Sequence, residues 1–452
     1  MTDSGAPALV WFRKDLRLRH NPALAAALER RWPVVPVFVW APEEEGAWPP
    51  GAASRWWLHG SLNSLATELE RRGLRLIVRR GPSAEALASL AEESGAASVF
   101  WNRRYEPAVI ARDRDVENLL RRRGLTVETF NGSLLFEPSS LHNANGQPFR
   151  VFTAFHRECE KHNPAPLAKN PPLRRPAPGN WPHSLALADL ALEPAVDWAG
   201  GLREAWQPGE AGARRQLRRF LRKALAEYPA HRDRPGMAGT SRLSPHLHFG
   251  EIDPREVRRE ILALEKGRRA ASRAYLRQFV WREFAYHLLY HFPETPEHPL
   301  RREFEAMPWQ PNPRYFKAWT KGRTGYPLVD AGMRELWRSG WMHNRVRMVA
   351  ASFLVKHLQI EWQQGAAWFW DTLVDADLAN NTLGWQWVAG CGADAAPYFR
   401  IFNPALQAAR FDPHGDYIRR WLPEGERHLP PIVDHPEARE RALEALRSIK
   451  KR

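Results

Sequence analysis

The first third of the chain alternates short apolar runs with amphipathic stretches. Five of the apolar runs have the length and composition of β-strands, and they cover residues 9–12, 34–40, 74–78, 98–101 and 125–130. Strands that are separated by helices run parallel in one sheet, with right-handed crossovers between them. The pattern therefore predicts an α/β domain over residues 1–135, built on a doubly wound, parallel five-stranded sheet. Sheets of this kind bind ligands at the carboxyl ends of their strands.

A different pattern begins after residue 135. Residues 136–205 are rich in proline, asparagine and glycine, which interrupt regular structure, so we expect a long connection between two domains. Beyond residue 205 the apolar positions repeat with helical spacing, with breaks at prolines such as Pro235, Pro254 and Pro293. The sequence therefore predicts a larger all-α domain over residues 206–452, which also holds most of the 21 tryptophans.

Length and charge agree with this division and point to a partner. A chain of 452 residues exceeds the size at which one hydrophobic core stops growing. It carries 66 Lys and Arg against 51 Asp and Glu, a formal net charge of +15. Such an excess favours a polyanionic partner, with nucleic acid as the first candidate. Charge alone is equally compatible with arginines spread over solvated faces.

Cysteine content and hydropathy indicate where the protein works. The two cysteines, Cys159 and Cys391, are too few for a disulfide framework or a four-cysteine cluster. No stretch approaches the roughly 20 apolar residues of a membrane span, and the N-terminus has no leader pattern. We expect a monomeric protein of the cytoplasm, with no membrane contact and no metal site.

Signatures of side-chain catalysis are missing from the sequence. No glycine-rich dinucleotide fingerprint follows the first strand, and there is no Walker loop, His-Glu-x-x-His, Cys-x-x-Cys or Gly-x-Ser-x-Gly. The helical half instead has polar clusters within apolar, aromatic surroundings, at residues 239–244, 281–283, 341–348 and 375–381. This pattern is typical of a site for a large cofactor that performs the chemistry itself.

Two of these clusters have distinctive side chains. Residues 240–244 place hydroxyl groups beside the free N–H groups of a helix start, which suits a diphosphate. The same pattern is more often a simple helix N-cap. In the cluster at 341–348, the helical spacing puts four residues on one face, namely Trp341, Asn344, Arg345 and Met348.

The arginines of this helix need partners. Arg345 and Arg347 lie on an otherwise apolar helix, where a buried charge without a partner is costly. A cofactor, a groove or a carboxylate can supply the partner, and Asp375 and Asp377 are the candidate carboxylates. A solvated loop that caps a helix explains these two aspartates equally well.

Longer motifs of the chain resemble DNA photolyases and cryptochromes over nearly its full length. These motifs are Val10-Trp11-Phe12-Arg13-Lys14-Asp15-Leu16-Arg17-Leu18, Trp281-Arg282-Glu283-Phe284, and residues 324–331, 341–348 and 384–404. Three further segments are most similar to the bacterial class III branch, which is related to plant cryptochromes, and they cover residues 101–105, 151–153 and 374–377.

The resemblance implies FAD, bound in a U shape within the helical domain. The positions that match the family's cofactor site are Tyr228, Thr240, Ser241, Arg242, Leu243, Ser244, Gln278, Arg282, Asn344, Arg347, Asp375, Asp377 and Asn381. In this set Tyr228 and residues 240–244 surround the phosphates, Asn381 lies beside flavin N5, and Arg347 pairs with Asp375.

The resemblance also assigns an electron relay to three tryptophans. In general a tryptophan fills core space, and this stays the interpretation for most of the 21 in this chain. The family's photoreduction chain matches Trp385 nearest the flavin, then Trp362, then Trp309 at the surface.

The reaction that the resemblance implies is light-driven repair of damaged DNA. Excited, reduced FAD donates an electron to a cyclobutane pyrimidine dimer that is flipped out of the duplex. Gln278, Trp281, Met348 and Trp387 match residues that contact the dimer. Three arginines match those that hold the flanking phosphates, and they are Arg232, Arg345 and Arg400.

Two alternatives concern the substrate and the role. Gln278 stands where most enzymes for cyclobutane dimers have a glutamate, and glutamine is usual in (6-4) photoproduct enzymes and animal cryptochromes. Met348 favours cyclobutane dimers, because (6-4) enzymes have histidine at this position. A cryptochrome-type blue-light photoreceptor keeps FAD and the tryptophans but signals instead of repairing. We expect the enzyme, since no long C-terminal signalling extension follows the helical domain.

A second, light-harvesting chromophore is expected against the α/β domain. The class III resemblance implies methenyltetrahydrofolate, with deazaflavin, another flavin or no chromophore as alternatives. Glu106 matches a residue that binds folate in some relatives.

Overall fold

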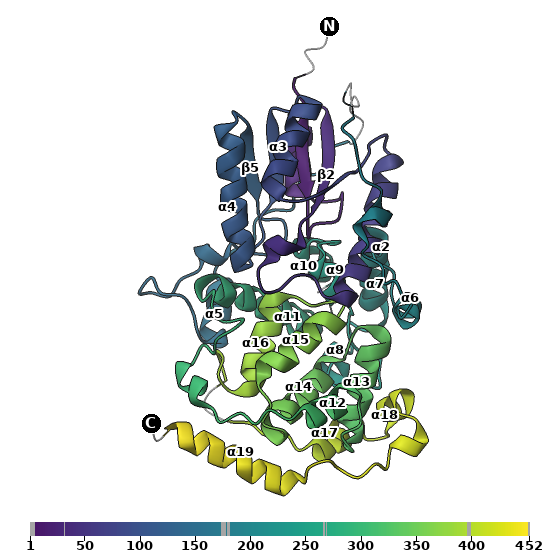
Figure 1. Ribbon diagram of the computed structural model, residues 1–452, viewed down its shortest axis with the longest axis vertical. Helices are drawn as coiled ribbons and strands as arrows, with labels where there is room; N and C mark the ends of the chain where they lie inside the picture. Colours follow the sequence, from purple (N-terminus) through teal and green to yellow (C-terminus); the bar gives the residue numbers. More distant parts are fainter. Residues whose placement is uncertain are drawn as a thin grey trace.

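The structure is a computed structural model, and it describes residues 5–30, 32–172, 178, 181–264, 267, 269–395 and 399–450. An α/β half and a helical half follow one another along the long axis of the molecule (Figure 1). Tyr398, part of the last family motif, lies outside the described residues.

The N-terminal half is built on the predicted parallel sheet. Its strands are β1 Ala8–Phe12, β2 Val34–Trp40, β3 Ile77–Arg80, β4 Ser98–Asn102 and β5 Thr126–Phe130, in the order β3-β2-β1-β4-β5. All neighbouring pairs are parallel. The five predicted strands are confirmed, except that β3 begins at Ile77. Leu74 and Leu76 are buried without pairing to β2, so their apolar character reports burial and not the strand.

Four helices cover the two faces of this sheet. They are α1 Pro22–Glu29, α2 Ala52–Glu70, α3 Ser83–Ser94 and α4 Pro107–Arg122. Alternate residues of β1 face opposite sides: Val10 and Phe12 pack in the same core as α1 and α2, whereas Leu9 and Trp11 pack in the core with α3 and α4. Because both faces are covered, every residue of β1, β2 and β4 is buried.

The connection between the halves has little regular structure. It contains α5 Phe152–Cys159, α6 Gly200–Ala205 and short 3₁₀ turns at Pro138–Ser140 and Leu187–Leu190. The domain boundaries at residues 135 and 205 remain predictions.

The C-terminal half is helical, as predicted. Its α-helices are α7 Glu210–Lys223, α8 Tyr228–His231, α9 Ser244–His248, α10 Pro254–Ala263, α11 Arg269–His291, α12 Pro313–Thr320, α13 Pro327–Ser339, α14 Asn344–Ser352, α15 Trp362–Thr372, α16 Leu378–Ala389, α17 Pro404–Phe411, α18 Asp416–Trp421 and α19 His435–Lys450. Short turns lie at Arg302–Ala306 and Glu424–Glu426, and a π-helix at Phe353–His357 continues α14. Among the described residues no helix is both long and apolar enough to cross a membrane.

The first family motif joins the two halves. Arg17 is buried, and it donates hydrogen bonds to the carbonyl oxygens of Gly132 (2.8 Å) and Gly250 (2.9 Å) and to Asp253 (3.0 Å). Gly250 has a φ of +61°, and a Cβ there would lie 2.2 Å from the carbonyl oxygen of Lys14. Only glycine allows this close approach, so the motif and the turn after α9 fix how the sheet meets the helices.

Candidate functional site

The loop that precedes α9 has the composition of a phosphate cradle. Ser241 Oγ accepts from the N–H of Leu243 at 3.3 Å, and Ser244 Oγ accepts from Trp341 Nε1 at 3.3 Å. The residue that caps α9 is Leu243, which has no side-chain capping bond, so the alternative of a simple N-cap is not what the structure contains. The hydroxyls therefore face neighbouring residues of the site instead of closing the helix end.

Arg242 is a half-buried cation between two indole rings. Its guanidinium carbon lies 4.2 Å from the ring centroid of Trp206 and 5.0 Å from that of Trp341. Its Nε is buried without a hydrogen-bond partner, and none of its nitrogens forms an ion pair with a described residue. Burial lowers the pKa of Arg242 from its ordinary value, as expected for an unpaired cation. An anionic group bound at this loop would supply the missing charge.

Arg347 and Asp375 form the predicted ion pair. Arg347 donates from one guanidinium nitrogen to both oxygens of Asp375, at 2.8 and 3.0 Å, and from Nε to the carbonyl of Met342 at 2.7 Å. Asp375 is buried, whereas Arg347 is half-buried and lies over Trp341. Trp341 thus connects this pair with the loop of Arg242 and Ser244.

Asp377 is a buried helix cap. It accepts from the backbone N–H of Asn380 at the start of α16 (2.9 Å), from His248 (3.5 Å) and from the hydroxyl of Tyr286. Burial alone would raise its pKa, but the partners, first His248 and then Arg282, hold the pKa of Asp377 well below its usual range. The capping role that we weighed for this aspartate is present, but the loop is buried and not solvated.

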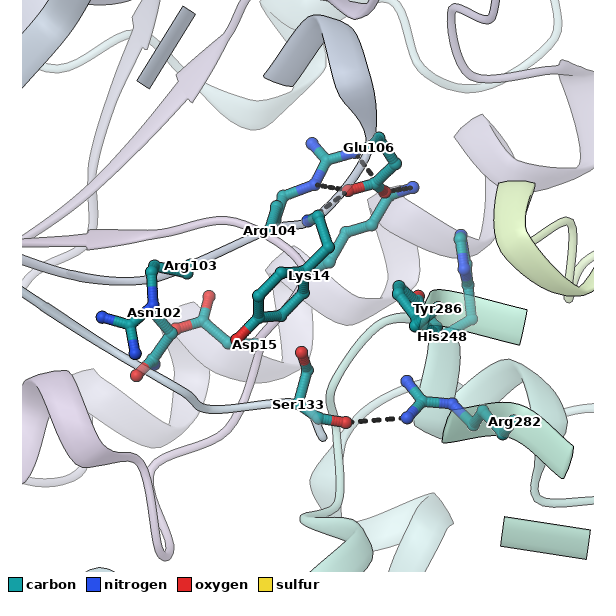
Figure 2. A pocket seen from close by; sticks show the side chains of 11 residues that line it. Lys14, Asp15, Asn102, Arg103, Arg104, Glu106, Ser133, His248, Arg282 and Tyr286 are labelled. Atoms are coloured by element: carbon teal, nitrogen blue, oxygen red, sulfur yellow. Dashed lines mark hydrogen bonds and ion pairs between the residues drawn. The ribbon is translucent and has the colours of Figure 1, made fainter. Parts of the chain in front are cut away.

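The Trp281-Arg282-Glu283 motif attaches α11 to the connection. Arg282 donates to the carbonyl of Ser133 at 2.8 Å (Figure 2), and Glu283 accepts from the N–H groups of Leu135 and Phe136 at 3.0 and 3.1 Å. Burial raises the pKa of Glu283 to about 7, and its Oε1 has no hydrogen-bond partner, although Arg282 lies 3.8 Å away. The motif therefore positions Arg282 beside Tyr286 and Asp377.

A second group gathers predicted DNA contacts. Arg232 donates to Gln278 Oε1 at 3.4 Å, and Arg345 pairs with Asp233 at 3.0 Å and lies over Phe411. Arg232 itself lies 4.0 Å from Asp233. The structure therefore brings Arg232, Gln278 and Arg345 together around one aspartate, which the sequence did not single out.

The predicted dimer walls have aromatic or cationic neighbours of their own. Trp281 stacks on Phe152 with ring centroids 3.5 Å apart and planes 2° from parallel. Arg400 lies 5.7 Å from the ring of Trp387. Phe152 is buried at the start of α5 and belongs to a segment that served only to recognise the class III branch, so no sequence signal pointed to this stack.

Three predicted site residues have few contacts to the other predicted residues. Asn344 is exposed, and its amide contacts only the sulfur of Met348, at 3.8 Å. Asn381 Nδ2 donates to the carbonyl of Ala366 at 3.1 Å. Tyr228 is buried against Phe220 and Tyr275, and the guanidinium carbon of Arg232 lies 5.5 Å from its ring centroid. Their polar atoms leave bonding capacity for a ligand.

The three relay candidates belong to one core. Trp385 and Trp362 are each 2% exposed, and the half-buried Trp309 packs against the same cluster. Among the described residues the ring contacts of Trp385 are with Phe369 at 5.0 Å and Trp319 at 6.3 Å. Gly365 is required beside it, because a Cβ there would lie 2.1 Å from the indole. Trp319 is a neighbour that sequence reasoning missed, since one sequence cannot show proximity.

Two hollows lie between the halves, near the carboxyl ends of β1, β2 and β4. The first, of about 370 Å³, is lined by charged residues that include Lys14, Arg104 and Glu106 (Figure 2). Glu106 pairs with Arg104 at 2.8 Å and Lys14 at 3.4 Å. The second, with about 610 Å³ of space that opens to solvent, has aromatic walls from Trp11, Phe38, Trp40 and Trp370. Three buried atoms beside it have no hydrogen-bond partner, and they are Trp11 Nε1, Arg13 Nε and Ser54 Oγ.

Known proteins match this chain over nearly its full length. Residues 8–176 match the family described as DNA photolyase, and residues 275–430 match the FAD binding domain of DNA photolyase. A deoxyribodipyrimidine photo-lyase of Agrobacterium fabrum is 48% identical, with 99% of this chain and 98% of that protein covered. Cryptochrome-1 of Arabidopsis thaliana is 41% identical over 98% of this chain and 66% of that protein. The crystal structure of a class III photolyase from Agrobacterium tumefaciens matches with a TM-score of 0.93 and 46% identity, covering 99% of this chain and 98% of that one.

Proposed function

The chain belongs to the DNA photolyase and cryptochrome family, and from this membership we propose that it repairs cyclobutane pyrimidine dimers in DNA with the energy of light. The observation that carries the proposal is the set of unsatisfied polar groups in the helical half, centred on Arg242. A half-buried cation between two indoles, beside the hydroxyls of Ser241 and Ser244 and the Arg347–Asp375 pair, fits the diphosphate end of a dinucleotide. The match of this half to an FAD-binding domain agrees with that chemistry.

The residues that would hold FAD divide by chemistry. Hydroxyls of residues 240–244 and the charge of Arg242 would bind the phosphates. Tyr228 would lie with them at the phosphates. Arg282, Arg347, Asp375 and Asp377 would orient the ring and ribose, together with Gln278, Asn344 and Asn381. When bound in its reduced form, FAD would supply the light-driven electron that opens the cyclobutane ring. Asp377 is held ionised by its partners, and it would act by fixing Asn380, His248 and Tyr286 around the ligand.

The residues on the DNA side would select the lesion. Trp281 and Trp387 would stack on a flipped dimer, and Met348 would contact it. Flipping costs a few kcal/mol and least at a damaged step, so part of the selectivity comes from the lesion itself. Phe152 keeps the ring of Trp281 parallel to its own, which lowers the entropy lost when a dimer stacks there.

Gln278 bears on whether the protein repairs cyclobutane dimers or (6-4) photoproducts. Its amide oxygen accepts from Arg232 and its nitrogen donates to the carbonyl of Ala274, so it offers a pyrimidine edge both an acceptor and a donor but no charge. We expect blue light to repair an oligonucleotide with a cyclobutane thymine dimer and to leave a (6-4) photoproduct unchanged. Repair of the (6-4) lesion alone would reverse the substrate assignment. Binding of both lesions without light-dependent repair would favour the photoreceptor.

A second chromophore would lie between the halves, and we propose methenyltetrahydrofolate. Since Glu106 is already engaged by Arg104 and Lys14, the larger hollow, with its aromatic walls and unpartnered donors, is the better place for the chromophore ring. We expect a near-ultraviolet absorption band in addition to the flavin bands of the purified protein, and we expect Trp40→Ala to remove it. Flavin bands alone would exclude the folate.

We further propose that the protein acts on DNA as a cytoplasmic monomer.

A further inference from the structure

Three arginines follow one another at intervals of four residues on the N-terminal part of α11. They are Arg269, Arg273 and Arg277, and the next position in this series is Trp281. All three arginines are exposed, and Trp281 is half-buried. Residues four apart are neighbours on a helix surface, each step rising about 6 Å. The arginines therefore form a stripe that leads along the helix to the proposed dimer wall.

The stripe has no acidic neighbours on its own helix. The first carboxylate after Arg269 is Glu283, which is buried and bonded to the backbone of the connection. Arg273 and Arg277 form no ion pair with any part of the chain that the structure describes. Exposed arginines elsewhere do pair, as Arg121 does with Glu117 at 2.8 Å. Like charges one turn apart destabilise a helix, so this arrangement favours an external anion.

Phe152 links the stripe to the dimer wall. The guanidinium carbon of Arg277 lies 5.3 Å from the ring centroid of Phe152, the same ring that stacks on Trp281. Because Phe152 is buried, it fixes both side chains relative to one another. An anion bound at Arg277 would therefore lie beside anything stacked on Trp281.

We propose that Arg273 and Arg277 bind phosphates of the DNA strand that extends from the lesion past Trp281. This inference rests on the proposed function and adds a second phosphate-binding region to Arg232, Arg345 and Arg400. Phosphates of one strand follow at about 3.4 Å along the duplex axis, so each step of the stripe spans about two of them. Arg345 is partly neutralised by Asp233, whereas Arg273 and Arg277 have no ion-pair partner among the described residues.

The test compares two double variants that remove equal charge. Arg273→Gln/Arg277→Gln alters the stripe. Arg114→Gln/Arg122→Gln alters exposed arginines of α4, on the α/β half, which also have no described ion-pair partner (Figure 1). Affinity is measured for a duplex with one cyclobutane dimer, from 50 to 200 mM salt, and for a dimer-containing trinucleotide. Circular dichroism confirms that each variant is folded.

The stripe variant is expected to bind the duplex about tenfold more weakly, and its log–log salt slope to fall by about 2, since each lost phosphate contact removes about 0.9. Its affinity for the trinucleotide, which lacks the flanking strand, should equal that of the wild type. The α4 variant should match the wild type throughout. An unchanged salt slope in the stripe variant, or an equal loss in the α4 variant, would overturn the inference. If the wild type itself does not bind the dimer-containing trinucleotide, the proposed function fails instead.

Discussion

An Asp375→Ala variant is expected to purify without FAD and to lose about 3 kcal/mol of folding stability. The carboxylate is 4% exposed and neutralises Arg347, whose side chain is 23% exposed. Removal of Asp375 leaves a partly buried guanidinium for which the carbonyl of Met342 is the one remaining acceptor among the described residues. The FAD-to-protein ratio follows from absorption, and stability from urea unfolding of the cofactor-free protein, so that loss of ligand binding does not enter the comparison.

A double variant separates the two effects. Arg347→Met/Asp375→Leu replaces the pair by apolar side chains of similar size, a change that is often neutral for stability. We expect its stability to return close to that of the wild type while FAD remains absent. Full FAD content in Asp375→Ala would remove this pair from the proposed cofactor site.

A Trp385→Phe variant is expected to lose photoreduction of bound FAD completely, while chemically reduced protein still repairs DNA. Phenylalanine fills most of the space beside Gly365 and Phe369 but is far harder to oxidise than an indole. The rate of FAD photoreduction is measured from flavin absorption under blue light, with an external reductant present. Normal photoreduction in this variant would exclude Trp385 from the relay.

Trp319→Phe is the matched control. Trp319 is fully buried, contacts Trp385 at 6.3 Å and donates its N–H to the carbonyl of Ala350. Its ring is in contact with that of Trp385, but it is not one of the three tryptophans that match the family's relay. We expect photoreduction at the wild-type rate, and a loss equal to that of Trp385→Phe would move the second step of the relay from Trp362 to Trp319.

The fold was predictable because it depends on patterns that are local in the sequence. Buried parallel strands are continuous apolar runs, and prolines such as Pro254 lie where helices begin. The start of β3 was misplaced because Leu74 and Leu76 are buried by side-chain packing without a strand partner. Burial and hydrogen-bond pairing are different requirements, and hydrophobicity reports only the first.

The site was predictable only in part, because a local sequence pattern does not show which distant residues lie close together in the fold. The cost of burying a lone charge left both Asp375 and Asp377 open as partners of the arginines, and the family resemblance paired Arg347 with Asp375. In contrast, no sequence pattern predicted that Phe152 would stack on Trp281 or that Asp233 would pair with Arg345. Both contacts join segments that are far apart in the chain, and both involve residue types with many ordinary roles.

Repair measured in light and in darkness tests the central claim most directly. Protein with chemically reduced FAD is mixed with an oligonucleotide that contains one cyclobutane thymine dimer. The fraction of strands that no longer contain the dimer is measured with and without blue light. We predict restored thymines only in the illuminated sample. Dimers that persist under illumination, with FAD bound and fully reduced, would contradict the account.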